Sequence, residues 1–100
     1  MSKVVGTYQD LMTEEIWQHI EKTLGYDADG LCRHLESLFD DNMTWDNHLR
    51  STKGFRWEMD HIIPRCELKY DSLSHPNFAK CWALSNLRPL EQKKNKLRNR

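Results

Sequence analysis

The chain has 100 residues, of which 38% are hydrophobic, and its 15 basic and 15 acidic side chains give a formal net charge of zero. This length fits one domain with a modest core, so we expect residues 1–100 to form a single domain. No run of about twenty apolar residues is present, and the N-terminus lacks the charged-then-apolar layout of a secretory signal. These absences exclude a transmembrane helix from the expected structure and predict a cytoplasmic protein.

The zero net charge conceals a gradient along the chain. Residues 1–48 carry three basic and ten acidic side chains (−7), residues 49–85 six and four (+2), and residues 86–100 six and one (+5). Such asymmetry predicts that the C-terminal part meets a polyanion, whereas the N-terminal part faces water or a basic partner.

Three cysteines, Cys32, Cys66 and Cys81, are widely spaced, and no Cys-x-x-Cys pair occurs. A zinc site built from Cys66, Cys81 and His75 is one interpretation of this set. The interpretation we favour is three reduced, mostly buried thiols, because a free cysteine behaves as a small hydrophobic residue.

The N-terminal part, residues 1–48, is predicted to be helical. Thr13 is a candidate N-cap followed by two acidic residues, and Gly25 is a candidate stop, which predicts a first helix between them. The apolar residues of this stretch recur at helical spacing: Ile16, Trp17, Ile20 and Leu24. A second helix is expected from about Asp29 to Phe39. His19 and His34 fall on these helices, and we assign neither a functional role.

The remainder predicts strands and short helices. Residues 55–59 alternate large apolar with charged side chains, as in a half-buried strand that leads into Asp60 and His61. In chain order, we then expect a loop over 65–76, a short helix over 77–83, an extended segment over 87–90 and a basic helix over 91–98. Pro89 indicates that the extended segment lies at a sheet edge.

Four residues in this part have side chains suited to metal and acid–base chemistry: Asp60, His61, Asn86 and Asn95. If the two extended segments and the following helix fold over one another, a carboxylate and an amide oxygen come together beside an imidazole. Such oxygens suit Mg²⁺ or a similar hard cation. An imidazole beside them can take a proton from water near neutral pH.

The sequence at these positions resembles the HNH endonuclease family, also called ββα-metal or His-Me finger nucleases. The resemblance rests on Trp57–Pro64 (WEMDHIIP), Ser85–Leu90 (SNLRPL) and Asn95, with the family's spacing between Asn86 and Asn95. Residues 34–47 and 78–90 are also similar to small phage and viral HNH proteins, so the resemblance covers about residues 31–100. It implies an α+β fold in which N-terminal helices pack on a ββα-metal core over 55–100.

The resemblance also implies a role for each of the four residues. His61 deprotonates the water that attacks phosphorus, while Asp60 and Asn95 bind one divalent cation. Asn86 hydrogen-bonds to the loop backbone and orients His61. The expected cation is Mg²⁺, with Mn²⁺, Ni²⁺ or Zn²⁺ as alternatives, and the expected partner is DNA. A monomer then nicks one strand, and a double-strand break requires a homodimer or two sequential cuts.

The chain departs from many HNH proteins at Glu91 and Lys94, where those proteins carry cysteines of a structural zinc site. No such zinc is therefore expected, and packing by apolar residues has to replace it: Trp57, Trp82, Leu87 and Leu90. Contacts to DNA phosphates are expected from basic residues near the C-terminal end: Arg88, Lys93, Lys94, Lys96 and Arg98.

Two other functions remain open from the sequence. One is a DNA-binding or packaging accessory protein that keeps the HNH shape but cuts poorly. The other is an RNA nuclease. The intact set of four residues favours the DNA endonuclease over the accessory protein.

Overall fold

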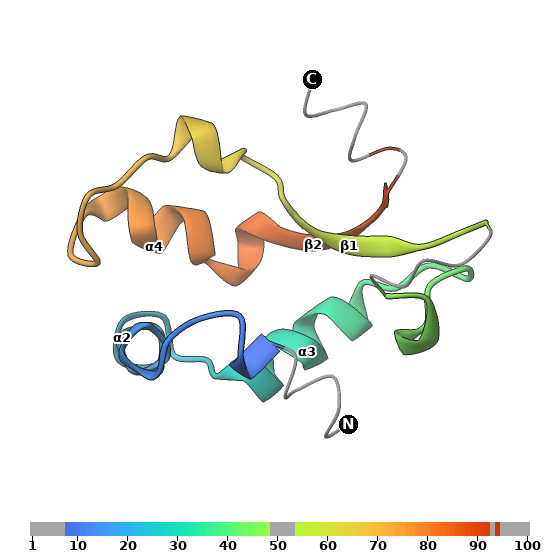
Figure 1. The fold of residues 1–100 in the computed structure, drawn as a ribbon, viewed down its shortest axis with the longest axis horizontal. Coiled ribbons are helices and arrows are strands. Elements are labelled where there is room, and N and C mark those ends of the chain that lie inside the picture. The colour runs from blue at the N-terminus through green and yellow to red at the C-terminus, as the bar shows by residue number, and fades with distance from the viewer. Residues whose placement is uncertain (1–7, 49–53, 93, 95–100) are drawn as a thin grey trace.

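We describe the fold from a computed structural model, in which residues 8–48, 54–92 and 94 are placed well enough to describe. These residues form a small α+β domain with helices α2, α3 and α4 and a two-stranded antiparallel sheet, which confirms the expected fold class. Figure 1 shows α2 and α3 on one side of the molecule, with α4 and the β1–β2 sheet on the other. No helix in these described ranges is both long enough and apolar enough to cross a membrane.

Helix α2, Glu14–Leu24, has the ends that the sequence predicts. The Thr13 hydroxyl accepts a hydrogen bond from the Ile16 amide at 3.3 Å, which satisfies one of the unpaired donors of the first turn. Gly25 ends the helix in the left-handed conformation (φ 79°), which glycine adopts without a steric penalty. Trp17 and Ile20 are buried on the inner face.

Helix α3, Ala28–Ser37, starts one residue earlier and ends two residues earlier than predicted. It starts earlier because the Asp27 side chain caps it by accepting from the Gly30 amide at 2.8 Å. The helix ends at Ser37, and Leu38 is its C-cap. From α3, the His34 ring nitrogen Nε2 lies 2.8 Å from the Leu87 carbonyl oxygen, which joins this helix to the sheet.

Strands β1, Trp57–His61, and β2, Leu87–Glu91, form the sheet. The register pairs Trp57 with Glu91 and His61 with Leu87. Strand β1 therefore begins two residues later than the predicted strand over 55–59 and includes both Asp60 and His61. Its start follows from the pairing, since β2 ends at the residue opposite Trp57. Strand β2 is longer by one residue than the expected segment, and among the described residues it pairs with β1 alone, which allows Pro89 to lie within it.

Residues 65–75 are mostly loop, as predicted for 65–76, with a 3-10 turn over Arg65–Glu67. Helix α4, Pro76–Trp82, follows it with the His75 side chain as its cap, and starts and ends one residue before the prediction. Of the basic helix predicted over 91–98, Glu91 instead ends β2, because it pairs with Trp57. Gln92 and Lys94 are helical, and the other residues of that prediction lie outside the described ones.

The core lies between the N-terminal helices and the sheet–α4 layer. The hydroxyl of Tyr26 donates to the Trp82 carbonyl at 2.6 Å and so links the two layers. Three of the four residues expected to replace a structural zinc site are buried: Trp57, Trp82 and Leu87. Leu90 is half-buried. All three cysteines lie in the described part as free thiols, with Cys32 and Cys81 buried and Cys66 exposed.

Candidate active site

The last two residues of β1, Asp60 and His61, form the centre of the candidate site. In the antiparallel register Asp60 lies opposite Arg88, and His61 lies opposite Leu87. Since side chains alternate along a strand, Asp60 and His61 leave β1 from opposite faces. At this end of β1 the Asp60 carboxylate meets Arg88, and the His61 ring meets Trp82.

On the carboxylate side, Asp60 is only 3% exposed. The Nε atom of Arg88 donates to its Oδ2 atom at 3.0 Å, and the Arg88 side chain is 37% exposed. A buried carboxylate is costly unless a charge and a hydrogen bond compensate it, and Arg88 supplies both. The cross-strand register brings Arg88, which the sequence analysis assigned to DNA contacts, to Asp60, and the predicted DNA contact stays a prediction.

On the imidazole side, the half-buried His61 ring meets the Trp82 ring edge-on, with centroids 4.8 Å apart. Burial, and less strongly the nearby Arg65 guanidinium, lower the pKa of His61 to about 4, against a smaller opposing effect of the Asp60 carboxylate. The imidazole is therefore uncharged at pH 7, the protonation state that a general base requires.

Asn86 fixes the backbone that follows His61. Its carbonyl oxygen accepts from the Ile62 amide at 2.8 Å, and its side-chain Oδ1 accepts from the Ile63 amide at 2.7 Å. Its Nδ2 donates to the Ile63 carbonyl at 3.3 Å and to the Cys81 carbonyl at 3.0 Å. These bonds, which we call the Asn86 clamp, confirm the expectation that Asn86 ties the loop backbone.

The structure thus brings three of the four predicted site residues to one end of the sheet: Asp60, His61 and Asn86. The fourth, Asn95, lies outside the described residues, as do three of the predicted DNA contacts: Lys93, Lys96 and Arg98. Lys94 is exposed on the short helical stretch after β2.

The donor chemistry of the site fits a hard divalent cation in part. Asp60 offers carboxylate oxygens, the ligand type that Mg²⁺ and Mn²⁺ prefer. Within residues 8–48, 54–92 and 94, no group of three or more His, Cys, Asp and Glu side chains is placed to hold a metal ion. That result also covers Cys66, Cys81 and His75, so the alternative zinc site is not formed. An ion at Asp60 would therefore depend on Asn95 and water for its other ligands.

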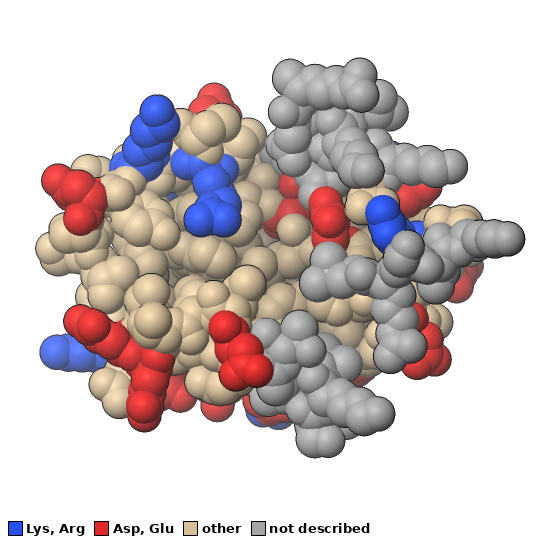
Figure 2. Space-filling model, viewed as in Figure 1, with Lys and Arg blue, Asp and Glu red and all other residues tan. Residues whose placement is uncertain are grey.

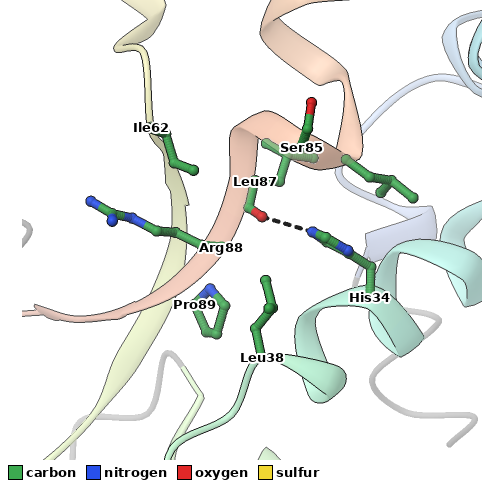
Figure 3. Close-up of a pocket in the computed structure, with 8 residues that line it drawn as sticks. His34, Leu38, Ile62, Ser85, Leu87, Arg88 and Pro89 are labelled. Carbon is green, nitrogen blue, oxygen red and sulfur yellow. Dashed lines mark hydrogen bonds between the residues drawn. The ribbon is translucent and has the colours of Figure 1, made fainter.

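A cavity of about 500 Å³ lies between the α3 end of the N-terminal part and β2 (Figure 3). Leu38 and Ile62 line it and are 48% and 42% exposed, unusually high for large aliphatic side chains. The other lining residues are His34, Leu84, Ser85, Leu87, Arg88 and Pro89. Sequence reasoning missed this cavity, and its one usable signal was the pair of apolar residues directly after His61, Ile62 and Ile63.

The surface charges of the described residues follow part of the gradient in the sequence. Figure 2 shows mostly acidic side chains along the lower edge, where α2 and α3 lie in Figure 1, and basic side chains together with acidic ones at the upper left, near α4. The exposed acidic residues of α2 include Glu14, Glu15 and Glu21. Exposed basic residues of the segment between the strands are Arg65, Lys69 and Lys80.

Comparisons with known proteins show two related sequences. The chain is 33% identical over 94 residues to uncharacterized protein L426 and 36% identical over 72 residues to uncharacterized protein L246, both of Acanthamoeba polyphaga mimivirus. These alignments cover 94% and 72% of this chain but only 35% and 29% of the relatives, so the chain spans about a third of their length. No family model and no solved structure matches the sequence. The chain is therefore similar to a segment of two larger viral proteins.

Proposed function

We propose that the protein is a metal-dependent endonuclease of the HNH class that hydrolyses DNA phosphodiester bonds. The observation that carries this proposal is the Asn86 clamp, because it fixes the backbone after Asp60 and His61 by the contacts that the HNH resemblance implies. The antiparallel β1–β2 pair followed by helical residues at Gln92 and Lys94 supports a ββα-metal core over residues 55–100.

In this proposal each side chain has one task. His61 accepts a proton from the attacking water, which its uncharged ring permits at neutral pH. Asp60 and Asn95 hold one divalent cation, Mg²⁺ in preference to Mn²⁺, Ni²⁺ or Zn²⁺. The bound cation would polarise the scissile phosphate and stabilise the leaving 3′ oxygen. The Asn86 clamp orients His61, and the basic residues around Lys94 neutralise DNA phosphates.

The proposal extends to the product and the setting. Hydrolysis leaves a 5′ phosphate and a 3′ hydroxyl, a single chain nicks one strand, and a homodimer is needed for a concerted double-strand break. We place the reaction in the cytoplasm of the cell that makes the protein. The mimivirus relatives have names that state no activity, so they neither support nor oppose the proposal.

The test is relaxation of supercoiled plasmid DNA with Mg²⁺, comparing the wild type with His61→Ala. Loss of the general base should slow cleavage by about 10²- to 10⁴-fold while DNA binding, measured by a mobility shift, is retained. His19→Gln is the matched control, because His19 lies on α2, which holds none of the proposed site residues, and it should cut at the wild-type rate.

Equal cutting by the wild type and His61→Ala would contradict the proposal. Binding without any cutting in either protein would favour the accessory protein. A parallel assay on RNA of the same sequence separates the DNA endonuclease from an RNA nuclease, since the proposal expects cleavage of DNA. Removal of the divalent ion with a chelator should abolish wild-type cutting, and readdition of Mg²⁺ should restore it.

A further inference from the structure

We propose that Arg65 is a substrate-binding residue whose guanidinium group binds the DNA phosphate on which His61 acts. This inference rests on the proposed function, because it takes a DNA phosphodiester as the substrate. It deepens that function by adding a phosphate-binding group to the site, and it does not depend on which side chains hold the cation.

The backbone between His61 and Arg65 is held by hydrogen bonds. The Asn86 clamp bonds both residues that directly follow His61. The Pro64 carbonyl then accepts from the Glu67 amide at 2.9 Å, which closes the 3-10 turn that begins at Arg65. The position of the Arg65 backbone relative to the proposed general base is therefore set by these contacts.

The Trp82 indole contacts both side chains. Its ring meets the His61 ring edge-on, with centroids 4.8 Å apart, and the Arg65 Cζ atom lies over the indole, 5.9 Å from its centroid. The indole itself is 5% exposed, and its Nε1 donates to the Tyr70 hydroxyl at 3.3 Å. Cation–π attraction to this fixed ring therefore holds the guanidinium group close to the imidazole.

The charge of Arg65 points to an anion as its ligand. The residue is exposed, and no carboxylate in the described part of the chain forms an ion pair with it. A guanidinium group donates two parallel hydrogen bonds to phosphate oxygens through its planar fork. Those oxygens carry negative charge through the transition state of hydrolysis, so the same contact accelerates the reaction.

Single-turnover cleavage of a short DNA duplex with Mg²⁺, at saturating protein, tests the inference on the full chain. Arg65→Gln should cut about 100-fold more slowly than the wild type, because the phosphate loses a charged donor. Its affinity for the duplex should fall by less than about threefold, since other basic residues contact the remaining phosphates. Arg65→Lys keeps the charge without the fork, and its rate should lie between those of the other two proteins.

Arg33→Gln is the matched control for removal of an exposed arginine. Arg33 pairs with Asp29 on α3, away from the proposed site residues, so this variant should cut at the wild-type rate. A wild-type rate for Arg65→Gln overturns the inference. A slow rate that recovers when more protein is added also overturns it, because Arg65 then contributes only to overall DNA binding.

A second measurement uses the wild type without a divalent cation and requires no cleavage. The side-chain Nε–Hε resonance of Arg65, assigned by its loss in Arg65→Lys, should shift when the DNA duplex is added. If the wild type cuts DNA but this resonance does not respond, the inference alone fails. If the resonance responds but the wild type never cuts with Mg²⁺, the proposed function fails while the phosphate contact stands. Absence of both a response and cutting overturns both.

Discussion

The two ends of β1 are held in different ways. At the Trp57 end the indole is 0% exposed, and three rings surround it: Phe39 at 5.0 Å, Trp45 at 5.3 Å and His48 at 4.3 Å between centroids. At the His61 end, hydrogen bonds of the Asn86 clamp and the Asp60–Arg88 pair dominate. One end is anchored by apolar packing from residues before the strand, and the other by polar contacts from residues after it.

Each end also buries an ionisable side chain, and the two are stabilised differently. His48 is 8% exposed, its Nε2 lies 2.7 Å from the Tyr8 hydroxyl, and burial lowers its pKa to about 4. Asp60 is 3% exposed and paired with a cationic side chain. An uncharged ring suits a structural anchor, whereas a buried carboxylate paired with a partly exposed guanidinium keeps charge at the His61 end. The contrast predicts that changes at the Trp57 end affect stability, and changes at the His61 end affect chemistry.

The largest expected effect on stability is at the Trp57 end. Trp57→Ala removes a fully buried indole and its Nε1 hydrogen bond to the Thr44 carbonyl, and should lower the free energy of unfolding by about 3 to 5 kcal/mol. Urea denaturation followed by circular dichroism measures this. Trp45→Ala, at a half-buried ring in the same cluster, should cost clearly less. Equal losses would mean that the cluster does not centre on Trp57.

Acid should weaken the same end by a smaller amount. The pKa of His48 is about 4 in the folded chain and about 6.5 when unfolded, so the unfolded chain binds the extra proton between these values. The stability that the uncharged ring supplies is complete above pH 6.5 and is lost as the pH falls toward 4. The difference in unfolding free energy between the wild type and His48→Gln should therefore fall by about 2 to 3 kcal/mol from pH 7 to pH 4.5.

Tyr8→Phe is the control for the acid effect. Burial, rather than the Tyr8 hydroxyl, lowers the pKa of His48, so this variant should keep the loss of stability on acidification. A wild-type minus His48→Gln difference that stays constant from pH 7 to pH 4.5 would contradict the assignment.

The sequence predicted local features better than cross-strand ones. The ends of α2 were predictable because Thr13 and Gly25 act within one turn of their own helix. The clustering of Asp60, His61 and Asn86 was predictable from the two extended segments at whose ends these residues lie. The Asp60–Arg88 pair was not, since it depends on a register that no local pattern fixes. The same holds for His34, which the sequence left without a role and which contacts the Leu87 carbonyl 53 residues away.

Of the three sites, the Asn86 clamp is expected to have the smallest effect on the free energy of unfolding. Its loss should instead show mainly in the rate of DNA cleavage. Asn86→Ala leaves the Ile63 amide without its acceptor and two carbonyls without their donor, which should cost about 2 kcal/mol. The plasmid cleavage rate should fall by about 100-fold in molecules that remain folded, because a small shift of the His61 backbone misplaces the general base. Trp57→Ala should do the reverse, with a larger loss of stability and a near-normal rate at a temperature where it is folded.

Two further variants, one at Asn86 and one at the adjacent Ser85, distinguish loss of the Asn86 clamp from a general loosening of the loop. Asn86→Asp keeps an acceptor for the Ile63 amide and loses the donor to the Ile63 and Cys81 carbonyls, so its cleavage rate should lie between those of the wild type and Asn86→Ala. Ser85→Ala changes the exposed residue next to it and should alter unfolding by less than about 0.5 kcal/mol. If Asn86→Ala cuts DNA as fast as Ser85→Ala, the clamp does not position His61, and the polar end of β1 is only a second structural anchor.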